Sequence, residues 1–161
     1  MAGLPRIKKL KALPSRRLAV TWKSGGTATI DMAGTIADFE PFRPLEDPGL
    51  FAAAEIVAFG RGIAWPNGLD FSADGLFELA LEQGREFTGA DFKAWQESLG
   101  FSNPETADLL GVDLSTIKNY RAKTTPLPRV VRFACDGLAA NRQTVRAHFH
   151  PRKAGRPKKT A

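Results

Sequence analysis

Residues 103–121 read Asn103-Pro-Glu-Thr-Ala107-Asp-Leu-Leu-Gly111-Val-Asp-Leu-Ser-Thr-Ile117-Lys-Asn-Tyr120-Arg, and this pattern predicts two short helices joined by a tight turn. Ala107 is small, as is needed where two helices cross closely, and Gly111 follows where the turn requires a left-handed backbone. Ile117 and Tyr120 then fall on the inward face of the second helix. This order is typical of a helix-turn-helix, whose second helix enters the major groove of DNA.

Helix signals before and after this motif extend the helical region. Thr88 and Asp91 have the spacing of a capping box, and Phe87 can pack on Phe92. Residues 87–147 are therefore expected to form an all-α domain of about four helices. The side chains expected to face inward on its flanking helices are Phe92, Trp95, Leu99, Val130, Val131, Ala134, Cys135 and Leu138.

Within the motif, the helix starts are expected at capping residues. Asn103 would cap the first helix with Pro104 at its first position, and Asp113 would cap the second. Residues 148–161 would follow the last helix as a basic, flexible tail.

The first 84 residues show the two-residue period of strands. Leu18, Val20 and Trp22 alternate with polar neighbours, Ser24-Gly25-Gly26 can turn the chain, and the apolar alternation then resumes, which predicts a hairpin. The other expected elements are an edge strand at 7–13, an irregular connection at 39–47, a short helix from Asp47 to Ala54, strands at 55–59 and 62–65, and a helix between Ser72 and Gly84. The sequence thus predicts an α+β fold, with a small antiparallel-sheet α+β domain at residues 1–84 followed by the all-α domain.

Charge is distributed unevenly along the chain, although its formal net charge is only +6. The first 23 residues carry seven basic and no acidic side chains, and residues 24–86 carry eleven acidic and three basic ones. From Leu114 onward there are twelve basic residues and one acid, Asp136. Clustered Lys and Arg favour an anionic partner at the C-terminal end, because they displace counterions from phosphates.

Cysteine content and hydropathy narrow the class of protein. The single cysteine, Cys135, excludes an internal disulfide and a cysteine zinc cluster, and a core position is its simplest role. The charged N-terminus has no apolar signal core and no apolar run reaches membrane-span length, so we expect a cytoplasmic location without membrane partners.

Two family resemblances cover most of the chain. Residues 92–140 resemble the lambda-repressor-like DNA-binding domains through Ala107, Leu110-Gly111-Val112, Ser115-Thr116-Ile117 and Tyr120. Residues 7–79 look like the bacterial domain of unknown function 2442 through the glycine-turn hairpin, Phe42-Arg-Pro-Leu45, Asp47-Pro-Gly-Leu-Phe51 and Ile63-Ala-Trp65-Pro-Asn-Gly68-Leu-Asp70. The second resemblance implies a small α+β module without established chemistry. By analogy with components found beside toxin–antitoxin genes, it also implies a toxin-like or other protein partner for residues 1–84.

The side chains expected to contact DNA lie on the second motif helix and at its end. Asn119 can pair with adenine and Lys118 with guanine, while the Ser115 hydroxyl can reach phosphate or base edges. The full set is Leu114, Ser115, Thr116, Lys118, Asn119, Arg121 and Lys123. Three positions give reasons for a difference from the family. Pro104 and Glu105 stand where a phosphate-anchoring glutamine is frequent, and Asp113 would repel phosphate unless it caps the helix or accepts a hydrogen bond from cytosine.

The C-terminal tail offers a second DNA-binding element. Its basic residues are Arg152, Lys153, Arg156, Lys158 and Lys159. Arg156 lies within a Gly-Arg-Pro core that resembles an AT-hook, which lies in the narrow minor groove of A·T tracts, and the other four flank that core. The match is partial because Ala154, not arginine, precedes Gly155. A plain basic tail that binds phosphates stays open as the alternative.

No residue constellation in the sequence supports catalysis. His148 and His150 lack a third ligand, so no metal site is expected, and neither a phosphate-binding loop nor a nucleophile–base pair is present. We therefore expect no enzyme and no cofactor, but a bacterial, antitoxin-like transcriptional regulator that binds double-stranded DNA as a homodimer. The alternative is a protein-interaction adaptor whose helical domain no longer binds DNA.

Overall fold

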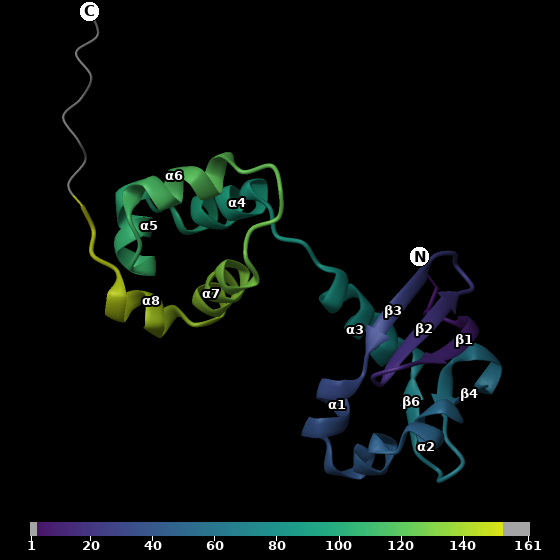
Figure 1. Ribbon diagram of the computed structural model, residues 1–161. Coiled ribbons are helices and arrows are strands. Elements are labelled where there is room, and N and C mark those ends of the chain that lie inside the picture. The colour runs from purple at the N-terminus through teal and green to yellow at the C-terminus, as the bar shows by residue number, and fades with distance from the viewer. Residues whose placement is uncertain (1–2, 153–161) are drawn as a thin grey trace, which may run out of the picture. The chain divides into compact units, whose positions relative to one another are not determined.

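A computed structural model describes residues 3–152 of the chain. The chain divides into two compact units, Met1–Arg85 and Glu86–Ala161. Figure 1 shows strands and helices mixed in the first unit and helices alone in the described part of the second. The predicted α+β fold is confirmed.

The first sheet contains the predicted hairpin. Strands β1 (Ile7–Leu13), β2 (Arg17–Trp22) and β3 (Thr27–Asp31) pair antiparallel in the order β1-β2-β3. Gly25 and Gly26 both have positive φ at the β2–β3 turn. The alternating residues of β2 face the core, where Leu18 and Val20 are fully buried. The edge-strand prediction for residues 7–13 is confirmed as well.

The segment after β3 is more helical than expected. Helix α1 spans Ala33–Asp38, a 3-10 helix spans Glu40–Glu46 and helix α2 spans Pro48–Ala52. The prediction of an irregular connection at 39–47 is therefore wrong. Prolines suppress a long α-helix but fit short 3-10 turns, which need few N–H donors. Asp47 begins α2 as expected, because its side chain accepts from the N–H of Leu50.

A second sheet completes the N-terminal unit. Strands β4 (Glu55–Val57), β5 (Gly62–Ala64) and β6 (Asp70–Ser72) pair antiparallel, and helix α3 (Ala73–Gly84) follows with Ser72 as its cap. Strand β6 was not predicted, since three residues carry too little periodicity. Between β5 and β6, Trp65 is buried and donates from Nε1 to the carbonyl of Phe51 at 3.1 Å.

A strained turn between β4 and β5 projects an aromatic side chain into solvent. Ala58 and Phe59 both have left-handed backbones, with φ of 50° and 57°. The Phe59 side chain is 89% exposed, so its own burial does not offset this strain. The next residue, Gly60, packs so closely that a Cβ there would lie 2.5 Å from the carbonyl oxygen of Ile7.

Replacing Phe59 by Asn should raise the free energy of unfolding by about 1 kcal/mol, because a left-handed residue costs roughly 1–2 kcal/mol and Asn tolerates this region best among residues with a Cβ. Urea denaturation measures the change. Leu4→Asn is the control, since Leu4 is also exposed and should leave stability unchanged. A loss of stability in the Phe59 variant would contradict this account of the turn.

The C-terminal unit contains five helices in its described residues, not about four. They are α4 (Gly89–Leu99), α5 (Asn103–Leu110), α6 (Leu114–Ala122), α7 (Arg129–Ala140) and α8 (Arg142–His148). Their shared core includes the buried side chains of Phe92, Trp95, Ala107, Ile117, Val131 and Cys135. The additional helix, α8, is capped by the side chain of Asn141, which directly precedes it.

Helix starts match the sequence predictions in part. The capping box of Thr88 and Asp91 is confirmed. In α5, however, the cap is Ser102, which forms a second capping box with Glu105, so the assignment of Asn103 as cap is one residue late. Asp113 occupies the cap position of α6, but its side chain makes no capping hydrogen bond there.

The inward face of α7 is rotated from the predicted one. Val131, Cys135 and Leu138 are buried as expected, whereas Val130 and Ala134 are exposed. The prediction is wrong there because α7 has two apolar faces and the sequence cannot tell which one packs. Burial raises the pKa of the Cys135 thiol to about 12.

Residues 149–152, which follow α8, contact the rest of the unit, so the predicted tail begins too early at residue 148. His148 is still helical, and the ring of Phe149 stacks on Phe101 with centroids 4.4 Å apart. No helix within residues 3–152 is long and apolar enough to cross a membrane.

Candidate nucleic-acid interface

The turn between α5 and α6 has the expected geometry. Gly111 caps α5 with φ of 68°, and its N–H donates to the carbonyls of Ala107 and Asp108. The N–H of Val112 also donates to the Ala107 carbonyl, at 3.0 Å. Ala107 and Ile117 are buried, so the two helices are locked together at a fixed angle. The turn therefore holds α6 in place and leaves its outer face free.

Helix α6 presents one continuous exposed stripe. At 3.6 residues per turn, positions 114, 115, 118, 119 and 122 fall on a single face. All five of these side chains are exposed, and they are Leu114, Ser115, Lys118, Asn119 and Ala122. The stripe combines two hydrogen-bonding groups, a cation and an apolar side chain, which are the groups that read base edges in a major groove.

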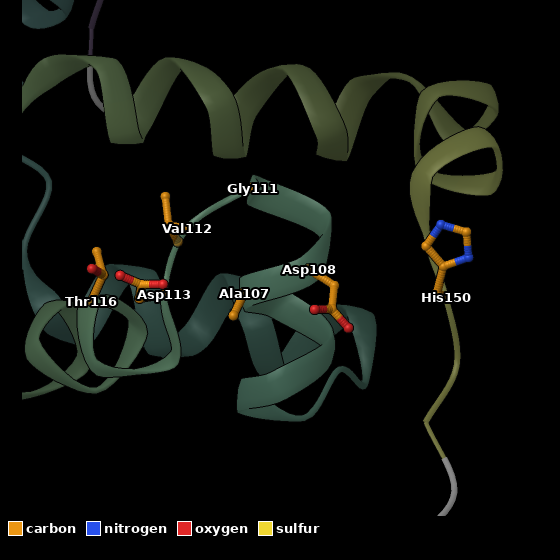
Figure 2. Close-up of a pocket in the computed structure, with 7 residues that line it drawn as sticks. All are labelled: Ala107, Asp108, Gly111, Val112, Asp113, Thr116 and His150. Carbon is orange, nitrogen blue, oxygen red and sulfur yellow. The ribbon is translucent and has the colours of Figure 1, made fainter.

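Thr116 lies outside this stripe. It lines a wide, open hollow of about 870 Å³ at the α5–α6 turn, together with Asp108, Asp113 and His150. Figure 2 shows Thr116 beside Asp113 at the start of α6, and Asp108 of α5 on the side of His150. The structure therefore separates Thr116 from the four predicted contact residues on the stripe, which are Leu114, Ser115, Lys118 and Asn119.

Arg121 is held by neighbouring side chains, although the sequence placed it among DNA contacts. Its Nη1 donates to Oε1 of Gln96, and Nη2 lies 3.9 Å from the Glu97 carboxylate. Gln96 is buried, and its amide nitrogen donates to the Phe101 carbonyl and to Oδ1 of Asn103. Gln96 thus ties the ends of α4 and α6 to the start of α5.

A second hollow lies beside this network. It has a volume of about 300 Å³ and is lined by Lys93, Asn103, Lys118, Arg121 and Ala122. Three cations therefore converge near the N-terminus of α5, where the helix dipole also favours an anion. Glu97 offsets part of this charge, since it lies 3.9 Å from both Lys93 and Arg121. A phosphate group is the kind of ligand that this arrangement suits.

Arg152 pairs with acidic side chains beside the motif. Arg152 forms a two-pronged contact with Asp108, from Nε at 2.8 Å and from Nη2 at 2.9 Å. The backbone N–H of Arg152 also donates to the Glu105 carboxylate, at 3.4 Å. The Arg152 hydrogen bond lowers the pKa of Asp108, and the hydrogen bond from the Ser102 side chain lowers that of Glu105. The other predicted tail contacts, Lys153, Arg156, Lys158 and Lys159, lie outside the described residues.

Arg152→Gln should raise the pKa of Asp108 toward its ordinary value of 3.8. A carboxyl group with a lowered folded-state pKa contributes stability above its unfolded pKa and loses it as pH falls through the folded value. The variant should therefore have a lower melting temperature than the parent at pH 7, and this difference should vanish below the folded-state pKa of Asp108. Thermal melts at pH 7 and at a pH below that pKa, with Arg142→Gln as control, measure the difference. An equal difference at both pH values would contradict the contact.

Lys93 and Gln96 were missed by the sequence analysis. Gln96 follows Phe92 by four residues and therefore lies on the inward face of α4, where a polar residue should have drawn attention. Lys93 carries no such signal, because a lysine on an exposed helix face is common. Lys123 is exposed at the end of α6, as expected. Among the described residues, no three His, Cys, Asp or Glu side chains gather to hold a metal.

No curated protein matches the chain. The chain is similar to a solved structure from Nitrosomonas europaea, named "Putative DNA Binding Protein NE0471 from Nitrosomonas europaea ATCC 19718", with 26% identity, 94% of this chain and 96% of that chain covered, and a TM-score of 0.47. Residues 7–82 match the family described as "Protein of unknown function (DUF2442)", which confirms the resemblance of the N-terminal unit.

Proposed function

We propose that the chain is a bacterial, cytoplasmic transcriptional regulator, antitoxin-like in its organisation, that binds DNA through a lambda-repressor-like helix-turn-helix. The exposed stripe of α6 carries this proposal, because its polar side chains are exposed on a helix whose inward face, with Ile117 and Tyr120, packs in the core. In this role Lys118 and Asn119 contact base edges, Ser115 contacts a base edge or phosphate, and Leu114 contacts a thymine methyl.

A basic hollow beside α6 supports the same orientation. The hollow of Lys93, Asn103 and Lys118 lies at the start of α5, next to the stripe on α6. Arg121 lines the hollow too, and it keeps donors beyond those used on Gln96 and Glu97. We assign this hollow to a backbone phosphate that flanks the bases contacted by α6. Lys123 and the basic residues of the tail add sequence-independent affinity.

A mobility-shift assay with duplex DNA from upstream of the protein's own gene tests the proposal. The expected result is a discrete complex whose affinity falls steeply as salt rises, since bound Lys and Arg release counterions. An unrelated duplex of equal length is the control and should bind more weakly. Absence of salt-sensitive binding to either duplex would refute DNA recognition by this chain.

We further propose that the regulator binds DNA as a homodimer, through the outer face of α7. Val130 is 69% exposed and Phe133 is 54% exposed, one turn apart on that face. An apolar hollow of about 480 Å³ lies next to Phe133 and is lined also by Leu109, Leu110 and Leu138. A protruding ring beside a hollow on one face allows a two-fold contact in which Phe133 of each copy enters the hollow of the other copy.

Phe133→Gln should weaken self-association by about tenfold or more, as expected for an aromatic anchor at the centre of an interface. Sedimentation velocity over a concentration series measures the dimer without DNA. Leu81→Gln is the matched control, because Leu81 is 59% exposed on α3 in the other unit. A dimer that is equally stable in both variants would place the interface elsewhere.

The exposed Phe59 favours a second function, that of an adaptor which binds a protein partner through residues 1–84. An aromatic ring held in solvent by a strained turn is typical of an interaction anchor. A toxin-like protein encoded by a neighbouring gene is the partner we would test. Loss of its binding in Phe59→Asn, in a chain that binds no DNA, would favour the adaptor over the regulator.

A further inference from the structure

A hollow in the N-terminal unit combines apolar walls with one cation. It has a volume of about 370 Å³ and lies between the β1–β2 turn and the start of α2. Leu13, Pro14, Pro48 and Phe51 form apolar walls, and Arg16 supplies the cation. This volume falls at the small end of the range for ligand pockets, roughly 300–1,000 Å³.

The Arg16 guanidinium is largely unused by the protein itself. Its Nε atom is buried without a hydrogen-bond partner, and Nη2 reaches the Glu46 carbonyl only at 3.5 Å, the limit for a hydrogen bond. Glu46 also lines the hollow, and within residues 3–152 no ion pair joins its carboxylate to Arg16. A guanidinium has five donors in a planar fork that matches a carboxylate.

The turn holds Arg16 at this place. Ser15 and Arg16 both have left-handed backbones, with φ of 61° and 56°, and the Arg16 carbonyl accepts from the N–H of Met32 at 2.9 Å. Two non-glycine residues in this region are costly, so the tight turn fixes the backbone from which the arginine projects. Phe51 is almost fully buried and supplies a firm wall.

We propose that this hollow binds a small monocarboxylate with an apolar body. The carboxylate pairs with the Arg16 guanidinium, and the apolar body lies against Leu13, Pro48 and Phe51. Glu46 at the rim selects against ligands with a second negative charge. The site lies in the N-terminal unit, so its occupancy is measured independently of DNA binding.

Hexanoate, hexylammonium and hexan-1-ol are suitable probes, because they share an apolar chain and differ in charge. Titrations of the full chain are followed by amide chemical shifts of Leu13, Ser15, Arg16 and Ala52. Hexanoate should give saturable shifts there and bind at least tenfold more tightly than the other two probes. Equal binding of hexanoate and hexylammonium, or no saturable shift, would overturn the proposal.

Arg16→Gln should weaken hexanoate binding at least tenfold, whereas Lys11→Gln, which removes one positive charge at an exposed position of β1, should leave it unchanged. Equal effects of both variants would overturn the proposal. If Arg16→Gln does not fold, Ala52→Phe provides the test, since it fills the hollow from its exposed rim and keeps the arginine. Unaltered hexanoate binding by Ala52→Phe would overturn the site.

Discussion

The double substitution Lys118→Ala and Asn119→Ala should lower the affinity for a specific duplex about 100-fold while leaving the stability of the protein unchanged. Both side chains are exposed on α6, so their truncation removes no packing within the protein. A good side-chain pair with a base is worth roughly 1–3 kcal/mol, and two such contacts together account for about two orders of magnitude. Fluorescence anisotropy with labelled duplex measures the loss.

The salt dependence of DNA binding by this variant separates the loss of base contacts from the loss of a phosphate contact. Lys118 also lines the proposed phosphate hollow, so its removal should reduce the slope of log affinity against log salt by about one. The control, Lys9→Ala with Gln143→Ala, removes the same charge and a similar amide at exposed positions away from α6. If the α6 variant binds the duplex with near-native affinity, and no more weakly than the control, α6 does not enter the groove.

The second large effect is expected at Gly89, the first residue of α4. Its N–H donates to the Lys123 carbonyl at 3.1 Å, which joins the start of α4 to the end of α6. A Cβ at this position would collide with the carbonyl oxygens of Lys123 and Tyr120, the latter at 2.5 Å. Because both obstacles are backbone atoms, no side-chain rotation relieves the contact, and α6 must move.

Gly89→Ala should therefore destabilise the C-terminal unit by about 2 kcal/mol, within the range for overpacked sites. Hydrogen exchange of the α4 and α6 amides measures local stability, and duplex binding should fall with it. Gly34→Ala is the control, since it stands in the first turn of α1 with no atom within 4 Å of a new Cβ. Unchanged hydrogen exchange of the α4 and α6 amides in the Gly89 variant would show that the contact between Gly89 and the end of α6 does not hold α6 in place.

Local signals predicted most of the helix boundaries and the first sheet. The capping box of Thr88 and the helix-ending glycines Gly100 and Gly111 depend only on residues within about four positions of them along the chain. Both glycines have the expected left-handed backbone. Ser102 was overlooked because Asn103 is also a good cap and stands directly before a proline. A one-residue shift of this kind follows from two adjacent residues with similar propensity.

Features that depend on tertiary packing could not be derived in the same way. The buried face of α7 could not be chosen because Val130 and Ala134 are as apolar as Val131 and Cys135. The engagement of Arg121 by Gln96 joins residues 25 positions apart, and the pairing of Arg152 with Asp108 joins residues 44 apart. In the candidate interface, the exposed stripe followed from helical periodicity, whereas the separate position of Thr116 and the basic hollow did not.

Selection of bound sequences from a pool of random duplexes, with the full chain, tests the central claim most directly. The proposed regulator should enrich a two-fold symmetric consensus whose half-sites lie about one helical turn apart, as expected for two α6 helices in successive major grooves. The same selection with the Lys118 and Asn119 double variant should lose this consensus. A pool that remains random after selection with the parent chain would contradict sequence-specific DNA recognition.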